Sequence, residues 1–376
     1  MKNIFICVLQ VLACWACSSP QQEDVIFVFD TSGSYPEKQI ALMDVCDISY
    51  IPIDDAEVVS GRPRVVTDER IIFVNRDGDF LIFDREGHFL NRFNHRGGGP
   101  GEYPYVGKVI YDLASDHLIV THDNRILTYT TMGDFVRGYT LDPHCFIWDI
   151  KDYTPEVLLI NNSQSLSSAY LMIEKETGRM LDSISLTVDS PVLPYVQVES
   201  DGMRFSYSPA YYNLVKGSDD HFLLNNISAD TFYVLDRNSN RKPYLVRQPS
   251  VQGQSDPIFV NAWIETGYGY FLSTVERKFD PESKDGFNQD YYVIEKGSQE
   301  IFRARMVHNE IEDYEIRLDP GLLERSANAS WGVISLPAEE LVEARDEGRI
   351  QSPRLAEIVR EMAEEDNPVL MLLHFK

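Results

Sequence analysis

The stretch from Arg64 to Phe93 reads RVVTDERIIFVNRDGDFLIFDREGHFLNRF, and it decides the fold class. It contains four short runs rich in β-branched and aromatic residues, and polar turn residues separate each run from the next. Two of the turns carry Asp77-Gly78 and Glu86-Gly87, and glycine there supplies the positive φ that a tight hairpin needs. The stretch therefore predicts one antiparallel meander of four strands.

The same arrangement recurs along the chain. The glycines expected in the last turn of the first three copies, Gly87, Gly133 and Gly178, lie 46 and 45 residues apart. Looser copies end at Phe232–Asp236 and at Tyr291–Gly297. Repeats of about 40–50 residues with four strands each are typical of propeller blades. The sequence thus predicts an all-β fold, a six-bladed β-propeller of four-stranded antiparallel blades.

The last fifty residues change in character and indicate how the ring closes. Ser335 is expected to cap a short helix that runs through Ala344, and Ser352 a second one. The apolar run 369–375 that follows predicts a terminal strand. An open ring would leave unpaired strand edges, so we expect this strand and the segment Ile48–Ile53 to share the sixth blade.

Residues 1–17 have the pattern of a targeting segment. Lys2 precedes the apolar run Ile4–Ala16, which is too short to span a bilayer as a helix. Cys14 and Cys17 each follow a small residue, as in a bacterial lipobox, where the cysteine is acylated after cleavage. Cys17 is preferred because a polar segment follows it, and an ordinary secretory signal with incidental cysteines is the alternative.

The predicted organisation is therefore a lipoprotein signal peptide over 1–17, a tether over 18–37 and a single propeller domain over 38–376. Only Cys46 and Cys145 remain in that domain, too few for a disulfide framework. Both lie in apolar runs, which favours two buried free thiols.

Charge excludes one class of partner. The chain has 59 acidic and 34 basic residues, a formal net charge of -25. A field of that sign repels phosphate backbones and anionic lipids, so nucleic acid is not expected as a partner.

Four stretches carry a resemblance to a known family. They are RGGGPGEY at Arg96–Tyr103, DISYIPI at Asp47–Ile53, DTFY at Asp230–Tyr233 and EDNPVL at Glu365–Leu370. The first resembles the inter-blade signature of NHL-type propellers. Together they resemble the six-bladed β-propeller lipoproteins of glycan-degrading, gut-type Gram-negative bacteria. The fourth repeat departs from the pattern, with Asn238 to Asn240 in place of the turn glycine, and so does an insertion at 278–290.

This resemblance implies a lipid-anchored protein of the outer membrane or cell surface, in contact with the membrane only through its anchor. It also implies a binding or scaffold role, with a glycan, a peptide or a membrane-associated protein of a glycan-uptake system as partner.

Candidate ligand-binding residues are Trp148, Trp263, Trp331 and Arg96. Each tryptophan is expected in the first strand of a blade, which lines the central channel, where a ring face could stack on a sugar. The alternative is that these rings pack between blades. Arg96 precedes three glycines whose amides could surround an anion, although a sharp reversal between blades explains the same residues.

No catalytic residue and no metal ligand is predicted, because HExxH, Cys-His zinc spacing and GxSxG are all missing from the sequence. The sequence favours a binding module without a cofactor. The alternative is a metal-dependent, lactonase-like hydrolase or lyase, with Ca²⁺ held at the central channel by residues from several blades.

Overall fold

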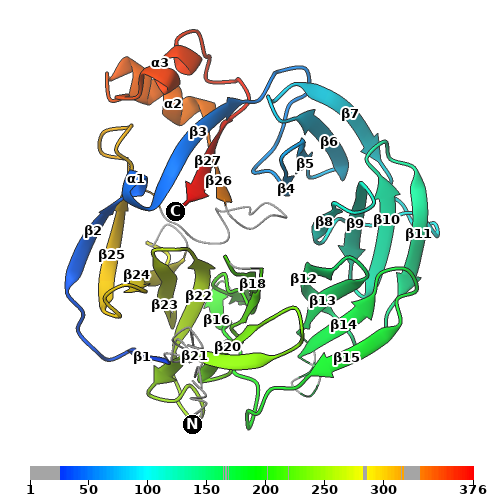
Figure 1. Cartoon of the computed structure of the whole chain (residues 1–376), viewed down its shortest axis with the longest axis vertical. Coiled ribbons are helices and arrows are strands. Elements are labelled where there is room, and N and C mark those ends of the chain that lie inside the picture. Colours follow the sequence, from blue (N-terminus) through cyan, green and yellow to red (C-terminus); the bar gives the residue numbers. More distant parts are fainter. Residues whose placement is uncertain are drawn as a thin grey trace, which may run out of the picture.

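The chain forms a closed ring of β-sheets (Figure 1). The computed structural model describes residues 26–376, apart from 164, 166, 168, 201, 219, 283–285, 315 and 317–330. Six sheets are arranged as blades around a central axis, which confirms the predicted all-β, six-bladed propeller.

The first three blades are contiguous antiparallel meanders, as the repeats predict. The first contains β4 (Val65–Val66), β5 (Arg70–Val74), β6 (Asp79–Asp84) and β7 (Phe89–Asn94). The second contains β8 (Val109–Asp112), β9 (His117–His122), β10 (Arg125–Thr130) and β11 (Phe135–Thr140). The third contains β12 (Ile147–Thr154), β13 (Val157–Asn162), β14 (Tyr170–Glu174) and β15 (Met180–Ile184).

The fourth and fifth blades each gain a fifth strand from the N-terminal segment. The fourth contains β18 (Leu214–Lys216), β19 (Phe222–Leu224), β20 (Thr231–Leu235) and β21 (Arg241–Gln248). The fifth contains β22 (Ile258–Glu265), β23 (Gly269–Phe279), β24 (Phe287–Glu295) and β25 (Ile301–Val307). Parallel to β21 and β25 lie β1 (Phe27–Asp30) and β2 (Glu37–Ala41), respectively. Part of the range 18–37, predicted as a tether, is therefore paired strand.

The sixth blade joins the two ends of the chain. After a short helix α1 (Leu42–Val45), β3 (Cys46–Pro52) pairs with β27 (Val369–Phe375), which also pairs with β26 (Trp331–Leu336). Cys46 lies opposite Phe375, and Pro52 opposite Val369. Closure of the ring by N-terminal and C-terminal strands is thus confirmed, in a sheet of three strands within the described chain.

Two short helices, α2 (Ala338–Asp346) and α3 (Pro353–Val359), lie between β26 and β27, as predicted. The start of the first was predicted wrongly. Ser335 lies in β26 opposite Leu370, because the strand ladder continues to Leu336, and Pro337 takes the N-cap position. Ser352 does cap α3, accepting a hydrogen bond from the Leu355 amide at 3.4 Å. In the described part of the chain, neither these helices nor α1 is long and apolar enough to cross a bilayer.

The turn glycines behave as the repeats predict. Gly87, Gly133 and Gly178 have φ of 93°, 95° and 74° in the turn before the last strand of their blades. In the fourth blade Ser239 takes this role, with φ of 64°. In the fifth blade Gln299 does so, with φ of 60°.

An additional hairpin, β16 (Val196–Ser200) and β17 (Met203–Tyr207), lies in the crossover from the third to the fourth blade. It contacts the predicted insertion, which lengthens the β23–β24 hairpin, through stacked rings of Tyr207 and Phe279 with centroids 3.9 Å apart.

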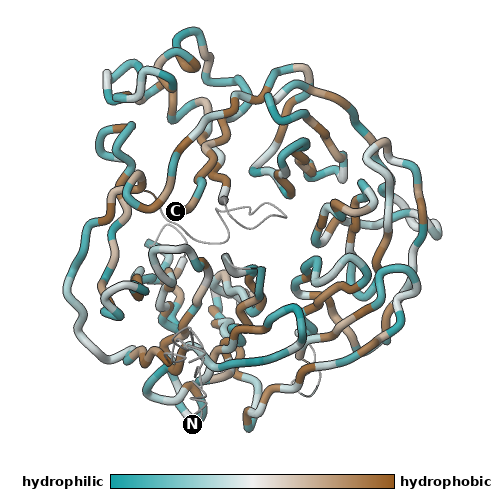
Figure 2. The backbone as a smooth tube through the Cα atoms, in the orientation of Figure 1, coloured by the Kyte–Doolittle hydropathy of each residue, from teal (hydrophilic) through white to brown (hydrophobic). Residues whose placement is uncertain are grey.

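Apolar side chains fill the spaces between neighbouring blades. Figure 2 shows hydrophobic segments along the strands and hydrophilic ones at turns and loops. Cys46 and Cys145 are both buried and free, as predicted, and burial raises the pKa of the Cys145 thiol to about 11.

Candidate functional site

One face of the ring gathers the crossovers between blades. Because strands alternate in direction, each crossover to the next blade leaves from the same face as the turn between the second and third strands. Two neighbouring cavities open there, of about 320 and 640 Å³. Tyr105, in the crossover from the first to the second blade, lines both of them. The two cavities form the candidate site.

The smaller cavity contains a stacked aromatic pair. Trp148, near the start of β12, and Tyr211, just before β18, have ring centroids 4.8 Å apart and ring planes at 10°. Trp148 lies in the first strand of the third blade, Tyr211 lies three residues before the first strand of the fourth, and both side chains are half-buried. Both rings line the cavity and give it an aromatic wall.

Polar groups surround this pair. The cavity is also lined by Lys108, Asp123 and Asp149, from the second and third blades. Asp149 is almost completely buried and contacts the Lys151 ammonium at 3.1 Å. These groups give hydrogen-bond donors and acceptors around an apolar platform, the composition usual in small-molecule sites.

Buried amides hold the platform in place. The Asn162 side chain accepts a hydrogen bond from the Phe146 amide at 3.1 Å, next to β12. The Asn261 side chain donates to the carbonyl of Ala210 at 3.0 Å, next to Tyr211. Each bond fixes backbone within two residues of one ring, so the pair is preorganised.

Tyr105 lies between the two cavities. Its hydroxyl donates a hydrogen bond to the Asp123 carboxylate at 2.5 Å, and its ring meets that of His122 edge-on at 6.1 Å. Partial burial and this carboxylate raise the pKa of Tyr105, so the phenol stays protonated. Burial, together with nearby Arg125, lowers the pKa of His122, and its ring is neutral at pH 7.

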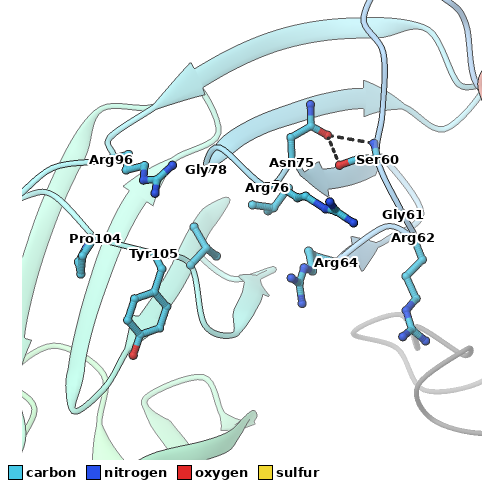
Figure 3. Close-up of a pocket in the computed structure, with 12 residues that line it drawn as sticks. Ser60, Gly61, Arg62, Arg64, Asn75, Arg76, Gly78, Arg96, Pro104 and Tyr105 are labelled. Atoms are coloured by element: carbon cyan, nitrogen blue, oxygen red, sulfur yellow. Dashed lines mark hydrogen bonds between the residues drawn. The ribbon is translucent and has the colours of Figure 1, made fainter. Parts of the chain in front are cut away.

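The larger cavity is lined by arginines (Figure 3). Arg62, Arg64, Arg76 and Arg96 come from the crossovers on either side of the first blade and from its β5–β6 turn. All four side chains are exposed. This places the predicted Arg96 beside three arginines that the sequence did not single out.

The glycine-rich loop at 96–103 is folded on itself. Glu102 accepts a hydrogen bond from the Gly99 amide at 2.8 Å, and a Cβ on Gly97 would lie 2.1 Å from the same carboxylate. The Tyr103 ring is completely buried, and its hydroxyl donates to the carbonyl of Gly78 at 2.9 Å. Because Glu102 accepts the hydrogen bond of a loop amide, that amide is not available to an anion. The glycines therefore allow the sharp reversal between blades, which places Arg96 at the cavity.

The structure brings together only part of the predicted site. Trp148 and Arg96 line neighbouring cavities, while Trp263 lies in β22 and Trp331 in β26, and their side chains are outside the described residues. Cys14 and Cys17 also lie outside the described residues. Among the residues described, no group of three or more His, Cys, Asp or Glu side chains could hold a metal ion.

Sequence reasoning missed Tyr105, Tyr211 and three of the arginines. Arg64, Tyr105 and Tyr211 share one signal, which is their position: each lies within five residues of the first strand of a blade. In a propeller, residues next to the first strand of a blade lie near the mouth of the central channel. A search of the sequence for aromatic and basic residues at such positions could have found them.

Fold and cavities define a six-bladed β-propeller with a ligand-sized depression at the face formed by its crossovers. The chain belongs to the family described as "Domain of unknown function (DUF4934)", whose model matches residues 26–374. No curated protein matches it.

One solved structure shows the same architecture. The chain is similar to a "Putative exported protein" from Bacteroides fragilis, with 15% identity and a TM-score of 0.57 over 94% of this chain and 100% of that one. It is also similar to a duf4221 family member from Bacteroides vulgatus, with 13% identity and a TM-score of 0.45 over 88% and 97%. At such identity the first likeness shows the fold alone.

Proposed function

We propose that this protein is an exported, lipid-anchored binding module that holds an oligosaccharide at the crossover face of its propeller. The observation that carries the proposal is the stacked pair of Trp148 and Tyr211 in the smaller cavity. A pyranose ring has an apolar C–H face that matches such an aromatic surface, and its hydroxyls need polar partners at the edge. Lys108, Asp123 and Asp149 supply those partners.

Binding is proposed in preference to catalysis because each carboxylate of this cavity is already held by a donor of the protein, while its remaining lone pairs can still accept from sugar hydroxyls. Asp123 accepts from Tyr105, and Asp149 from Lys151. Bound oligosaccharide is therefore expected to be recovered chemically unchanged.

The test is a binding measurement with a panel of oligosaccharides on the purified protein. Trp148→Ala should weaken binding about tenfold, the loss of one stacking platform, while Trp148→Phe retains most of it. The matched control is Met132→Ala, an exposed apolar side chain in the β10–β11 turn, on the opposite face. If Trp148→Ala lowers the melting temperature as well as the affinity, the loss of binding would reflect loss of packing, and Trp148 would be assigned a packing role.

Two other results would replace the proposal. Hydrolysis or elimination of an oligosaccharide or lactone, abolished by a chelator, would establish the metal-dependent alternative. Capture of a membrane-associated protein that Trp148→Ala does not weaken would establish a scaffold that uses another surface.

The anchor is proposed at Cys17, or at Cys14, with the outer membrane or cell surface as location. Replacing both cysteines by Ala should release the protein from the membrane fraction, while either single replacement identifies the acylated residue. Retention of the double variant in the membrane fraction would contradict lipid anchoring.

A further inference from the structure

The larger cavity has a charge opposite to that of the whole protein. Its twelve lining residues include Arg62, Arg64, Arg76 and Arg96 and no Asp or Glu. The chain as a whole carries a formal net charge of -25. Four guanidinium groups around a cavity of about 640 Å³ repel one another. An anion bound between them would stabilise this cluster of positive charge.

Carboxylates of the described residues neutralise little of the charge on Arg64, Arg76 and Arg96. Arg96 lies 3.6 Å from Asp77, and both side chains are more than half exposed, so the contact is weak. The guanidinium groups of Arg64 and Arg76 have no hydrogen-bond or ion-pair partner among the described residues. They are available to an external ligand.

The backbone around the cavity is fixed. The Asn75 side chain accepts hydrogen bonds from the amide and the hydroxyl of Ser60, both at 3.0 Å (Figure 3). It also donates to the carbonyl of Val58 at 3.2 Å. These bonds tie the segment that leads to Arg62 and Arg64 to the turn that carries Arg76. The backbone segments that carry Arg62, Arg64 and Arg76 therefore keep a fixed position relative to one another.

Guanidinium groups bind planar or tetrahedral oxyanions through paired N–H donors, which suits carboxylates and sulfate esters. Tyr105 lines this cavity and the aromatic one, so a single chain of sugar residues can reach both. A long polyanion such as nucleic acid would meet the repulsive field of the remaining surface.

From this arrangement we infer that the ligand is an acidic oligosaccharide. One sugar ring stacks on an outer ring face of the Trp148–Tyr211 pair, and carboxylate or sulfate groups on a neighbouring sugar bind Arg64, Arg76 and Arg96. The inference rests on the proposed function and specifies its substrate class.

The experiment compares matched ligands. An oligogalacturonide is charged and its fully methyl-esterified form is neutral, while a κ-carrageenan oligosaccharide is charged through sulfate and its desulfated form is neutral. The charged member of one pair should bind at least tenfold more tightly at low salt, with an affinity that falls as salt rises. The pair that shows the difference identifies carboxylate or sulfate as the recognised group.

Variants separate this inference from the proposed function. Arg64→Gln and Arg76→Gln should each weaken the charged ligand about tenfold and leave the neutral one unchanged, whereas Trp148→Ala weakens both. Arg76→Lys should restore part of the loss, and Arg354→Gln, an exposed arginine in α3, is the control.

Neutral ligands that bind as well as charged ones, with no effect of the arginine variants, would overturn the inference and leave the proposed function standing. Failure of every oligosaccharide to bind would overturn both. A single-stranded oligonucleotide that binds more tightly than any acidic sugar would overturn the inference in favour of nucleic acid.

Discussion

The first and the sixth blades are built from similar strands but from different parts of the chain. The first is one contiguous meander from β4 to β7, and every strand pairs with its neighbour in sequence. The sixth places β3 beside β27, which are separated by nearly the whole chain. The first blade can form locally, whereas the sixth requires the ring to be closed, and this blade should therefore respond most strongly to change.

Removing the terminal strand should have the largest effect. Residues 369–373 are buried almost completely, and deletion of 367–376 removes them and exposes the edges of β26 and β3. The lost burial is roughly 10 kcal/mol, comparable to the stability of a whole domain. We expect insoluble protein or loss of the cooperative unfolding transition in calorimetry.

Deletion of Lys376 alone is the control for that truncation and should change the melting temperature little. A truncated protein that unfolds like the parent would show that the ring closes without β27.

Gly87→Ala tests the junction between the two blades. Gly87 has φ of 93°, and an added Cβ would lie 2.1 Å from the carbonyl oxygen of Pro52 at the end of β3. Backbone strain and this clash should destabilise the protein by about 3 kcal/mol, measured by urea unfolding.

Gly253→Ala is the matched control, because Gly253 has φ of 76° but open space around its Cβ position. It should lose only about 1 kcal/mol. Equal losses in both variants would mean that the first and sixth blades can separate at this point without cost.

His308 gives the sixth blade a pH dependence. Its Nδ1 accepts from the amides of Glu310 and Ile311 at 3.0 and 3.1 Å, so the proton is on Nε2, which lies 3.2 Å from the Tyr50 hydroxyl of β3. Burial lowers the pKa of His308 from 6.5 to about 4. Between pH 6.5 and about pH 4 the unfolded chain binds a proton at this ring and the folded chain does not. The free energy of unfolding therefore falls as pH decreases through this window.

This contribution is on the order of 3 kcal/mol. His308→Asn keeps an acceptor in place of Nδ1 but does not titrate, so its unfolding free energy should depend less on pH in that window. His88→Asn in the first blade, where the ring is exposed, is the control. Parallel pH profiles for His308→Asn and the parent would contradict the assignment.

The smallest effect is expected at a turn. Gln299 occupies, with φ of 60°, the place where the first blade has Gly87. Gln299→Gly should relieve this conformation and stabilise the protein by about 0.5–1 kcal/mol, read as a higher urea midpoint. A lower midpoint would mean that unfolded-chain entropy dominates at this turn.

The sequence predicts the contiguous blades well because their signals are local. Strand periodicity and the glycines at 87, 133 and 178 specify each meander without reference to the rest of the chain. Closure was also predictable, because a ring cannot be left open. The parallel pairing of β1 with β21 and of β2 with β25 could not be predicted, since those partners are edge strands whose free hydrogen bonds leave no mark in sequence.

The site was predicted less completely for a similar reason. Trp148 could be named because tryptophan in a first strand is conspicuous, but its partner Tyr211 comes from the next blade. The clustering of Arg64 and Arg76 depends on a turn and a crossover that meet only in three dimensions. Convergence of residues from several loops is set by tertiary geometry, which no local pattern records.

The outer strands β1 and β2 also bear on when this chain can fold. Phe27 pairs with Leu245, Glu37 with Arg303 and Cys46 with Phe375, so this early segment has partners that are synthesised much later. Such a chain has a high contact order and cannot complete its structure while it is still emerging. The proposed export requires the protein to cross a membrane as an extended chain. Delayed folding keeps the polypeptide unfolded, and therefore able to cross, until synthesis is nearly finished.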